Sequence, residues 1–323
     1  MGRFRLTIFQ QEWWLKIARG SARLKEVQVQ DANGIVVSSL TYVVYHNMLG
    51  IPLGSGSWLS RVSGPIVCDN LSDEEKIIVL TQLLKKLPNI SFGFSIREHT
   101  PNAHLIRQAF KNAGFECFEQ INYSQPPRAG INRLGPKLRK HIKQAYNKLD
   151  IISIDSDEFI NFYQTNLDES KKKCNFSLKV ARELIAISVA REPSQARIIA
   201  AARKRPEHTF EQSAIDAAIC LVWDDERCYY WLSTHRKKSH PDAVKLLIVE
   251  AMKHASKLGL IVDADDVSTP GSQRLFGTIF NMPNEERRYI FTYTSRLSRL
   301  YETQRAKLDK IKRLGEALGL PSY

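Results

Sequence analysis

The strongest constraint on how this chain can fold is the order of its predicted elements, because the same order occurs twice along 323 residues. In each half, hydrophobic periodicity predicts two strands, a helix, a strand, a second helix and a last strand. Strands that alternate with helices in this way are typical of mixed α/β proteins. We therefore predict a mixed α/β fold built from two similar halves, a duplication of architecture and not of residues.

Two local signals mark the first half. Asn33-Gly34 supplies the positive φ of a hairpin turn between strands at 27–29 and 35–44. Ser72, with Glu75 three residues later, forms a capping box that begins a helix. The other elements predicted in this half are a short helix at 12–22, a strand at 90–96, a helix at 102–113 and a strand at 115–123.

In the second half, a hairpin across Asp224-Asp225-Glu226 joins two predicted strands, and Gly259 ends the long helix that follows. The elements predicted there are strands at 216–223 and 228–234, a helix at 241–258, a strand at 260–265, a helix at 272–281 and a strand at 288–293. A basic helix at 298–318 carries leucines, so we expect it to serve packing or a homo-oligomer contact.

The clearest change in composition lies between the halves. Residues 125–130 are typical of a linker, and residues 126–149 include no acidic side chain. The helix predicted at 135–149 is strongly basic, so it is either a solvated surface or a phosphate contact at a domain junction, where ligands commonly bind. The predicted division is an N-terminal domain at 1–125, a basic connection at 126–149, a C-terminal domain at 150–297 and a terminal helix at 298–323.

Charge and composition limit the partners and the compartment. Lysine and arginine outnumber aspartate and glutamate by 47 to 34, a net charge of +13, which favours an anionic partner such as a nucleotide, RNA or a membrane surface. No apolar run approaches the roughly eighteen residues that span a bilayer, and residues 1–14 lack the apolar core of a secretory leader. The five cysteines form no C-x-x-C pair and no spaced ligand set, so we expect a reduced, cytoplasmic protein with no metal.

Four stretches resemble a known family. They are the basic helix at 134–145, the strand 229–234 before Ser239-His-Pro, the run 258–280 with its strand ending in aspartate, and Arg61 shortly before Gly64-Pro65. Together they are similar to motifs of the FemABX-type double-GNAT acyltransferases, over roughly residues 10 to 300. Two places differ from the family pattern: the loop 235–241 has no glycine, and Arg274 stands where the family has lysine.

The resemblance implies an acyl-CoA donor whose carbonyl oxygen is received by backbone amides of the strand from Tyr230 to Thr234. The helix that begins at Pro241 would present unpaired N–H groups and a positive dipole end to the donor's phosphates. The basic residues just before it would add charge, and the alternative is that they are only solvated. The expected contacts of coenzyme A are Ser233, Thr234, Arg236, Lys237, Lys238 and Ser239.

Three side chains are candidates for taking the proton of the acceptor amine. Asp263 and Asp265 fall on one face of a strand beside Asp266, and crowded carboxylates raise the pKa of at least one of them. A turn or helix-cap cluster is the competing interpretation. His235, at the end of the preceding strand, is the second candidate, although a surface histidine is the commoner case.

The resemblance also places Arg61 and, more weakly, Arg139 in a cleft between the halves, where guanidinium groups would hold the diphosphate of a nucleotide-linked sugar. A surface ion pair is the competing interpretation for either arginine. Tyr229 and Tyr230 face opposite sides of their strand, so one belongs to the core and the other to the site. Arg274 completes the expected substrate contacts.

We therefore expect an N-acyltransferase that moves an acyl group from acyl-CoA to the amino group of a nucleotide-linked amino sugar, for surface polysaccharide (O-antigen or capsule) biosynthesis. The C-terminal half would bind the donor and carry catalysis, and the N-terminal half would bind the acceptor. One alternative is an aminoacyl-tRNA-dependent transferase that extends a peptidoglycan precursor, which the basic charge also fits. Another is a double-GNAT protein that binds a nucleotide or RNA without turnover.

Overall fold

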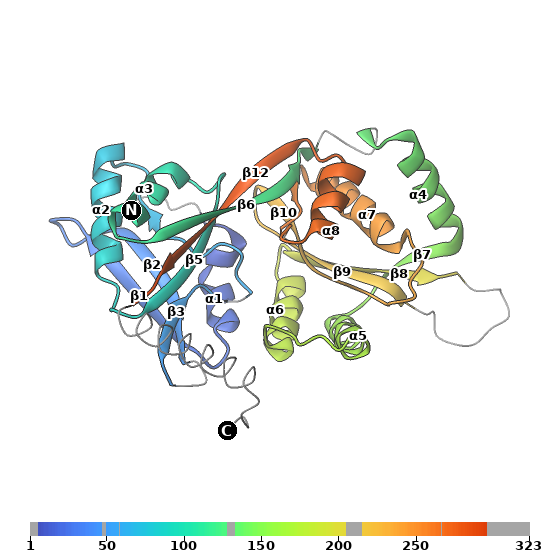
Figure 1. The fold of residues 1–323 in the computed structure, drawn as a ribbon, viewed down its shortest axis with the longest axis horizontal. Helices are drawn as coiled ribbons and strands as arrows, with labels where there is room; N and C mark the ends of the chain where they lie inside the picture. The colour runs from blue at the N-terminus through green and yellow to red at the C-terminus, as the bar shows by residue number, and fades with distance from the viewer. Residues whose placement is uncertain are drawn as a thin grey trace, which may run out of the picture.

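The computed structural model describes residues 6–46, 50–57, 59–127, 133–204, 215–265 and 267–295. Within these residues the chain forms one twelve-stranded mixed sheet with helices on both faces (Figure 1), which confirms the predicted mixed α/β class. The helix predicted at 298–318, the carboxylate of Asp266 and residues 128–130 of the linker lie outside the described part of the chain. None of the described helices is both long enough and apolar enough to cross a bilayer.

The elements follow the chain in this order. The strands are β1 (Arg23–Gln30), β2 (Val36–His46), β3 (Pro52–Ser55), β4 (Ile66–Val67), β5 (Ser91–Arg97), β6 (Glu116–Gln125), β7 (Leu149–Ser153), β8 (Ala196–Arg203), β9 (Ile215–Trp223), β10 (Arg227–His235), β11 (Ile261–Asp263) and β12 (Asn284–Tyr293). The helices are α1 (Glu12–Ala18), α2 (Asp73–Lys85), α3 (Ala103–Asn112), α4 (Pro136–Lys148), α5 (Ser156–Glu169), α6 (Leu178–Ala190), α7 (Ala243–Leu258) and α8 (Pro270–Gln273), which continues as a π-helical stretch over Arg274–Ile279.

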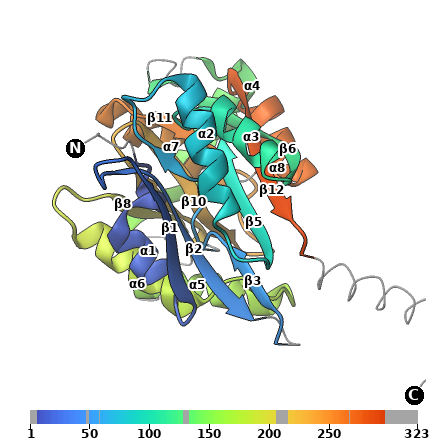
Figure 2. The same cartoon turned by 90° about the vertical axis from the view of Figure 1, so that its left-hand side faces the viewer.

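Three hydrophobic cores hold the helices to the sheet. In the second half, α4 and α7 pack on one face, and α5 and α6 pack on the other. In the first half, α2 and α3 lie together against the sheet (Figure 2). α1 comes from the start of the chain yet packs with the second half, where the ring of Trp14 lies 5.1 Å from that of Trp231 on β10.

The two halves exchange their last strands. The sheet order is β1-β2-β3-β5-β12-β6-β11-β10-β9-β8-β7, with β4 paired to β2. β12, the last strand of the chain, therefore lies between β5 and β6 of the first half and is antiparallel to both. β6 in turn pairs with β11 of the second half. The crossing of β6 and β12 is the junction between the halves in Figure 1, and neither half has a complete sheet without a strand from the other.

The predicted duplication is visible in the pairing pattern. Among the described strands only two pairs are parallel, β3 with β5 in the first half and β10 with β11 in the second. Each parallel pair covers three residues and lies on the inner side of its half, next to the exchanged strands. The two halves therefore repeat one architecture around the β12–β6 pair.

Most local predictions are confirmed, with one region missed. The Ser72–Glu75 capping box is present, and Gly34 has a φ of 77° in the hairpin turn. The strand predicted to reach residue 265 ends at Asp263, because Asp265 has a left-handed φ of 65°. No element was predicted between 150 and 203, where the structure has β7, α5, α6 and β8.

We expect the exchanged strand to carry a large share of the stability of the first half. The ring of Phe291 on β12 stacks on that of Phe110 on α3, with centroids 4.0 Å apart and planes at 6°. Phe291→Ala should lower the free energy of unfolding by about 3–5 kcal/mol, because it leaves a cavity at a fully buried position. Urea denaturation followed by fluorescence measures this loss. Phe118→Ala on the neighbouring strand β6 is the control, since that ring is 54% exposed, and an equal loss in both variants would contradict the expectation.

Candidate functional site

The site forms where two parallel strands separate. β10 and β11 pair for only three residues, from Arg227 opposite Ile261 to Tyr229 opposite Asp263. β10 then continues along β9 as far as His235, and its pairing shifts by one residue at Trp231, which forms a bulge. The edge of β10 beyond Tyr229 therefore has no neighbouring β11 residues and can accept an extended ligand through its backbone groups.

A cleft of about 780 Å³ lies at this separation, and we call it the splay cleft. β10, the start of α7 and the α8 region form its main walls. Residues from further away close it on the other side. The lining side chains that matter below are Arg61, Phe176, Tyr230, Ser233, His235, His240, Lys245 and Arg274.

Two histidines in the splay cleft have opposite hydrogen-bonding roles. Nδ1 of His235 lies 3.1 Å from the carbonyl oxygen of Arg236, so it carries the proton and leaves a lone pair on Nε2. Nδ1 of His240 accepts from the backbone N–H of Asp242 at 3.2 Å, so its proton is on Nε2. In their neutral forms, His235 can therefore accept a proton from a ligand, whereas His240 can donate a hydrogen bond.

Tyr230 is the strand tyrosine that faces the splay cleft. Its side chain is largely buried and packs edge-on against Phe276, with centroids 5.6 Å apart. Burial raises the pKa of Tyr230 to about 12, with Ser233 acting in the opposite direction. The phenol therefore stays protonated near neutral pH and can donate a hydrogen bond. Tyr229 faces the other core, and its hydroxyl donates to Asp224 at 3.0 Å.

Arg61 connects the two halves at the splay cleft. It comes from the loop after β3, and its Nη2 donates to the carbonyl oxygen of Trp231 on the bulge at 3.3 Å. Its Nε lies 2.7 Å from Oδ2 of Asp265, which follows β11. The Arg61 side chain is 20% exposed and lines the splay cleft, so one guanidinium spans the separation between β10 and β11.

Asp265 is buried between two arginines. Arg97 at the end of β5 contacts the other oxygen of its carboxylate, with Nη2 2.6 Å from Oδ1. Burial raises the pKa of Asp265, and the nearby charge of Asp263 adds to this, while Arg61 and Arg97 act against it. The carboxyl is fully buried and is covered from the cleft by Arg61.

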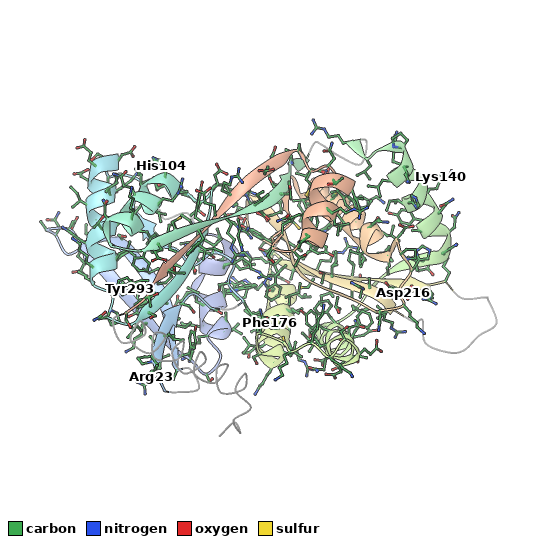
Figure 3. All side chains as sticks on the ribbon, in the orientation of Figure 1. Arg23, His104, Lys140, Phe176, Asp216 and Tyr293 are labelled. Carbon is green, nitrogen blue, oxygen red and sulfur yellow. The ribbon has the colours of Figure 1, made fainter. Side chains whose placement is uncertain are left out.

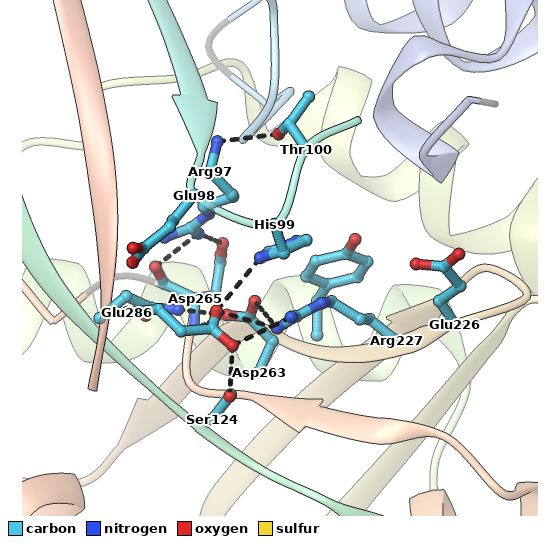
Figure 4. Close-up of polar contacts among 12 residues, drawn as sticks. Arg97, Glu98, His99, Thr100, Ser124, Glu226, Arg227, Asp263, Asp265 and Glu286 are labelled. Atoms are coloured by element: carbon cyan, nitrogen blue, oxygen red, sulfur yellow. Dashed lines mark hydrogen bonds and ion pairs between the residues drawn. The ribbon is translucent and has the colours of Figure 1, made fainter. Parts of the chain in front are cut away.

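Asp263 belongs to a second buried ion cluster, which Figure 4 shows. Its Oδ1 accepts from Asn122 at 2.9 Å, and its Oδ2 lies 3.3 Å from Nη1 of Arg227. Arg227 also binds Glu286, at 3.0 and 2.9 Å, and Nδ1 of His99 lies 3.1 Å from Glu286. The cluster joins β10, β11, β12 and the end of β5 across the strand exchange.

The charges in this cluster keep its carboxyls ionised. Burial raises the pKa of Asp263, but Arg97, His99 and Arg227 outweigh it and lower the pKa overall. Burial likewise raises the pKa of Glu286, and hydrogen bonds from His99 and Arg227 overcome this and lower it to about 2. Asp263 is fully buried and lines no wall of the splay cleft, so its position offers no direct path for a proton from a ligand there.

His99, Asp263 and Glu286 bring three ligand atoms within 4.8 Å of one another, which is close enough for a metal ion. A guanidinium already binds two of the three, because Arg227 contacts both Asp263 and Glu286. That bound cation satisfies the charge that a metal would otherwise neutralise, so these residues form an ion-pair cluster.

The loop between β10 and α7 is held by a buried carboxylate and needs no glycine. Asp216 accepts from the backbone N–H of His240 at 2.9 Å and from Nε of Arg203 at 3.0 Å. Arg203 also donates to the carbonyl oxygen of Lys238 at 2.9 Å. This anchoring leaves the side chains of Lys237 and Lys238 exposed on the loop.

The structure brings together some of the predicted site residues and separates others. Those that line the splay cleft are Arg61, Tyr230, Ser233, His235, Ser239 and Arg274. Those that do not line it are Thr234, Arg236, Lys237, Lys238, Tyr229, Arg139, Asp263 and Asp265. Thr234 accepts from Asn166 of α5, and Arg139 is exposed on α4, the helix at the outer edge that carries Lys140 in Figure 3.

Sequence reasoning missed several wall residues. Tyr163, Asn175 and Phe176 come from the region between 150 and 203, where no element was predicted. His240 and Lys245 belong to the first turns around the start of α7, and the predicted helix boundary there could have identified them.

A second groove adjoins the splay cleft between α1 and α6, and we call it the α1–α6 groove. It has a volume of about 630 Å³ and shares Leu59 and Phe176 with the splay cleft; Figure 3 places Phe176 between the halves. Its rim carries Lys16, Arg19 and Lys179, and one acidic residue, Glu183. The rim of the groove therefore carries more cations than anions, and the groove adjoins the splay cleft at Leu59 and Phe176.

Comparisons with known proteins identify the fold. No family model and no curated protein sequence matches the chain. The crystal structure of FemX is similar, with a TM-score of 0.62, 11% identity and coverage of 92% of this chain and 94% of that one. So are the C-terminal domain of a putative lysylphosphatidylglycerol synthetase from Agrobacterium fabrum (TM-score 0.54, 12% identity, 90% of each chain) and L-PGS from Bacillus licheniformis (0.51, 12%, 87% of each). At these identities the similarity shows a shared fold over nearly the whole chain.

The low pKa of Glu286 predicts a pH dependence of stability. Its value in the folded state, about 2, lies below the ordinary 4.5, so its contribution is present above about pH 4.5 and is lost as the pH falls toward 2. Glu286→Gln should lower the free energy of unfolding on the order of 3 kcal/mol at pH 6, and the difference from wild type should narrow below pH 4.5. Urea midpoints across this range measure it. Glu285→Gln, which removes an exposed carboxylate, should change little; a difference that stays constant with pH would contradict the assignment.

Proposed function

We propose that this chain is an N-acyltransferase that moves an acyl group from an acyl-CoA thioester to the amino group of a nucleotide-linked amino sugar. The observation that carries the proposal is the splay cleft, where β10 leaves β11 beside the start of a sixteen-residue helix. The fold shared with FemX supports a transferase of the double-GNAT type. The proposal assigns the acyl donor to the splay cleft and the acceptor to the adjoining α1–α6 groove.

The donor would bind along β10. A pantetheine chain is extended and carries amide groups, so it can hydrogen-bond the strand edge that β11 leaves open. Its phosphates would reach the start of α7, where the helix dipole and Lys245 are favourable to anions. Asp242 is paired there with Lys245 at 2.6 Å and His141 at 3.3 Å, so its own negative charge is balanced. Arg274 on the opposite wall adds a further cation.

The acceptor would enter through the α1–α6 groove. Arg19 and Lys179 suit a diphosphate, and the sugar amine would have to pass Leu59 and Phe176, where the groove adjoins the splay cleft, to reach the thioester. Donor and acceptor would thus approach from different openings. The two reacting atoms would therefore meet inside the protein, and neither substrate would block the entrance of the other.

The chemistry requires one proton acceptor and one stabilised oxyanion. The amine attacks the thioester carbonyl, the C–N bond forms, the C–S bond breaks and the thiol of CoA leaves. Nε2 of His235 would take the amine proton, because it carries the lone pair of a side chain that lines the cleft, and would pass that proton to the sulfur of the leaving CoA. Backbone amides at the Trp231 bulge would donate to the oxyanion. Asp265, behind Arg61, would hold that guanidinium in place.

Binding of coenzyme A tests the donor assignment. Calorimetric titration of the full chain should give saturable one-to-one binding, and Lys245→Gln should weaken it about tenfold through the loss of a phosphate contact. Lys257→Gln, at the other end of α7, is the matched control and should bind as wild type. Absence of saturable binding to the wild-type chain would overturn the acyl-CoA donor.

Aminoacyl-tRNA is the alternative donor, and the net charge of +13 fits an RNA ligand. If coenzyme A fails to bind while tRNA binds with a steep salt dependence, the chain is an aminoacyl-tRNA-dependent transferase acting on a peptidoglycan precursor. Binding of nucleotide or RNA with no release of product from either donor would instead indicate a protein without turnover.

The tautomer assignment predicts different effects for two neighbouring histidines. His235→Gln should lower kcat by about 10²–10⁴-fold, because it removes the proton acceptor. His240→Gln keeps a side-chain donor and should leave kcat within about tenfold, with its effect mainly on KM. Release of free thiol from an acyl-CoA with an amino-sugar nucleotide measures both. Equal losses of kcat in the two variants would show that His235 has no distinct role.

A further inference from the structure

Helix α4 carries exposed charge of one sign. Its buried side chains, Leu138, Ile142 and Ala145, recur at helical spacing and pack in the core that α4 shares with α7. No acidic side chain occurs between residues 126 and 149. The exposed cations on α4 and just before it, which together we call the α4 basic face, are Arg133, Lys137, Arg139, Lys140, Lys143 and Lys148.

The fold does not neutralise the α4 basic face. None of its six side chains has a hydrogen-bond or ion-pair partner within the described residues. The acidic side chains that contact α4 or directly follow it are each bound to another cation, in the pairs Asp242–Lys245, Glu250–Lys253 and Asp150–Lys204. Six positive charges are therefore left for solvent or for an anionic partner.

This charge is unfavourable for the helix itself. The first turn of α4 has no acidic residue and includes Lys137, whereas α2 has three acidic residues there. A cation at this end opposes the helix dipole. Arg139 and Lys143 are four residues apart, and Lys140 and Lys143 are three apart, so like charges repel along the exposed side. A local rule broken without a compensating contact in the fold is typical of a functional surface.

The position of α4 excludes a role in the cavities described above. No α4 residue lines the splay cleft or the α1–α6 groove. The helix lies at the outer edge of the second half in Figure 1, and Figure 3 places Lys140 there. It is about 20 Å long. A convex row of cations of this length suits an extended anionic surface better than a small ligand.

The composition of the α4 basic face favours a membrane over RNA. Clusters of roughly four to eight lysines and arginines bind anionic lipid headgroups through their summed charge. Single-stranded RNA is bound by stacking on aromatic side chains, but Tyr146, the tyrosine of α4, binds Glu250 and Lys253. The apolar side of α4 is used in the core, so the contact with lipid depends on charge alone.

We propose that the α4 basic face binds the surface of a membrane that contains anionic lipids. The headgroup phosphates supply the negative charge that the fold does not provide for the six cations. The proposal does not depend on the acyl transfer assigned to the splay cleft, since α4 lines neither of the two cavities used there.

Sedimentation of the full chain with lipid vesicles tests the proposal. We expect the chain to bind vesicles in which a third of the lipid is phosphatidylglycerol and the rest phosphatidylcholine. Binding should fall steeply as salt is raised, because salt screens exposed charges. No binding to these vesicles, or equal binding to phosphatidylcholine alone, would overturn the proposal.

A triple variant locates the contact. Replacing Lys137, Lys140 and Lys143 together by Gln should weaken vesicle binding at least about tenfold, since each lysine near the surface contributes a factor of about five. The thermal midpoint should not fall, because these side chains have no partner within the described residues and their mutual repulsion is removed. Vesicle binding that stays unchanged in this variant would overturn the proposal.

The matched control removes the same charge from exposed positions of the first half, by the substitutions Lys25→Gln, Lys85→Gln and Lys111→Gln. It should bind the vesicles as wild type does, and an equal loss in both triple variants would contradict a specific role of α4.

Two further titrations separate this proposal from the others. The α4 variant should bind coenzyme A as wild type does, so failure of the donor assignment and failure of the membrane contact are distinct results. If the vesicles do not retain the wild-type chain while the α4 variant loses binding to tRNA, the partner of the α4 basic face is RNA and the proposal is overturned.

Discussion

The pairing of β12 with β5 and β6 is the constraint on which the rest of the structure depends. Because β12 occupies the edge of β5, the first half cannot close its own sheet with β6, and β6 extends instead to β11. β11 is short and pairs with β10 for three residues only, which opens the splay cleft. The last strand of the described chain thus determines where the splay cleft of the second half begins, and it fixes both halves in one sheet.

Buried charge reinforces this exchange at the same place. Arg97 from β5 and Arg61 from the loop after β3 meet Asp265, while Arg227 from β10 meets Asp263 and Glu286. Removing such groups from water is costly, and only mutual pairing with good geometry offsets the cost. The two contacts of Asp265 join the halves directly, whereas those of Arg227 join β10 to β11 and to the exchanged strand β12. The first cluster also places the guanidinium of Arg61 across the splay cleft.

The sequence predicted the elements whose signals are local. The Ser72 capping box, the glycine turn at Gly34 and the long helix ended by Gly259 are all in place. The strand exchange could not be predicted, because hydrophobic alternation in β12 is the same whichever neighbours it pairs with. From the crowding of Asp263 and Asp265 we predicted that the pKa of at least one of them is raised and that it acts as a general base. The pKa of Asp265 is raised, chiefly by burial, while that of Asp263 is lowered. Arginines from other strands and loops lie against both carboxyls, and no local sequence pattern indicates such partners.

Comparison of the two halves shows why, within the described residues, the cleft beside the parallel strand pair is open in the second half and filled in the first. In the first half, the chain after β3 runs back beside β5 and hydrogen-bonds to it. The backbone N–H of Gly56 donates to the carbonyl oxygen of Gly93, and that of Ser63 donates to the carbonyl oxygen of Ser95. This return needs glycine, since a Cβ at Gly56 would lie 2.0 Å from Cβ of Ser63, and one at Gly64 would lie 2.2 Å from Cγ2 of Ile96. In the second half, the chain after β10 turns away to the loop anchored by Asp216 and then to α7. The segment that fills the space beside β3 and β5 in the first half also carries Arg61, whose guanidinium contacts β10 in the second half. The first half therefore supplies a wall residue to the splay cleft.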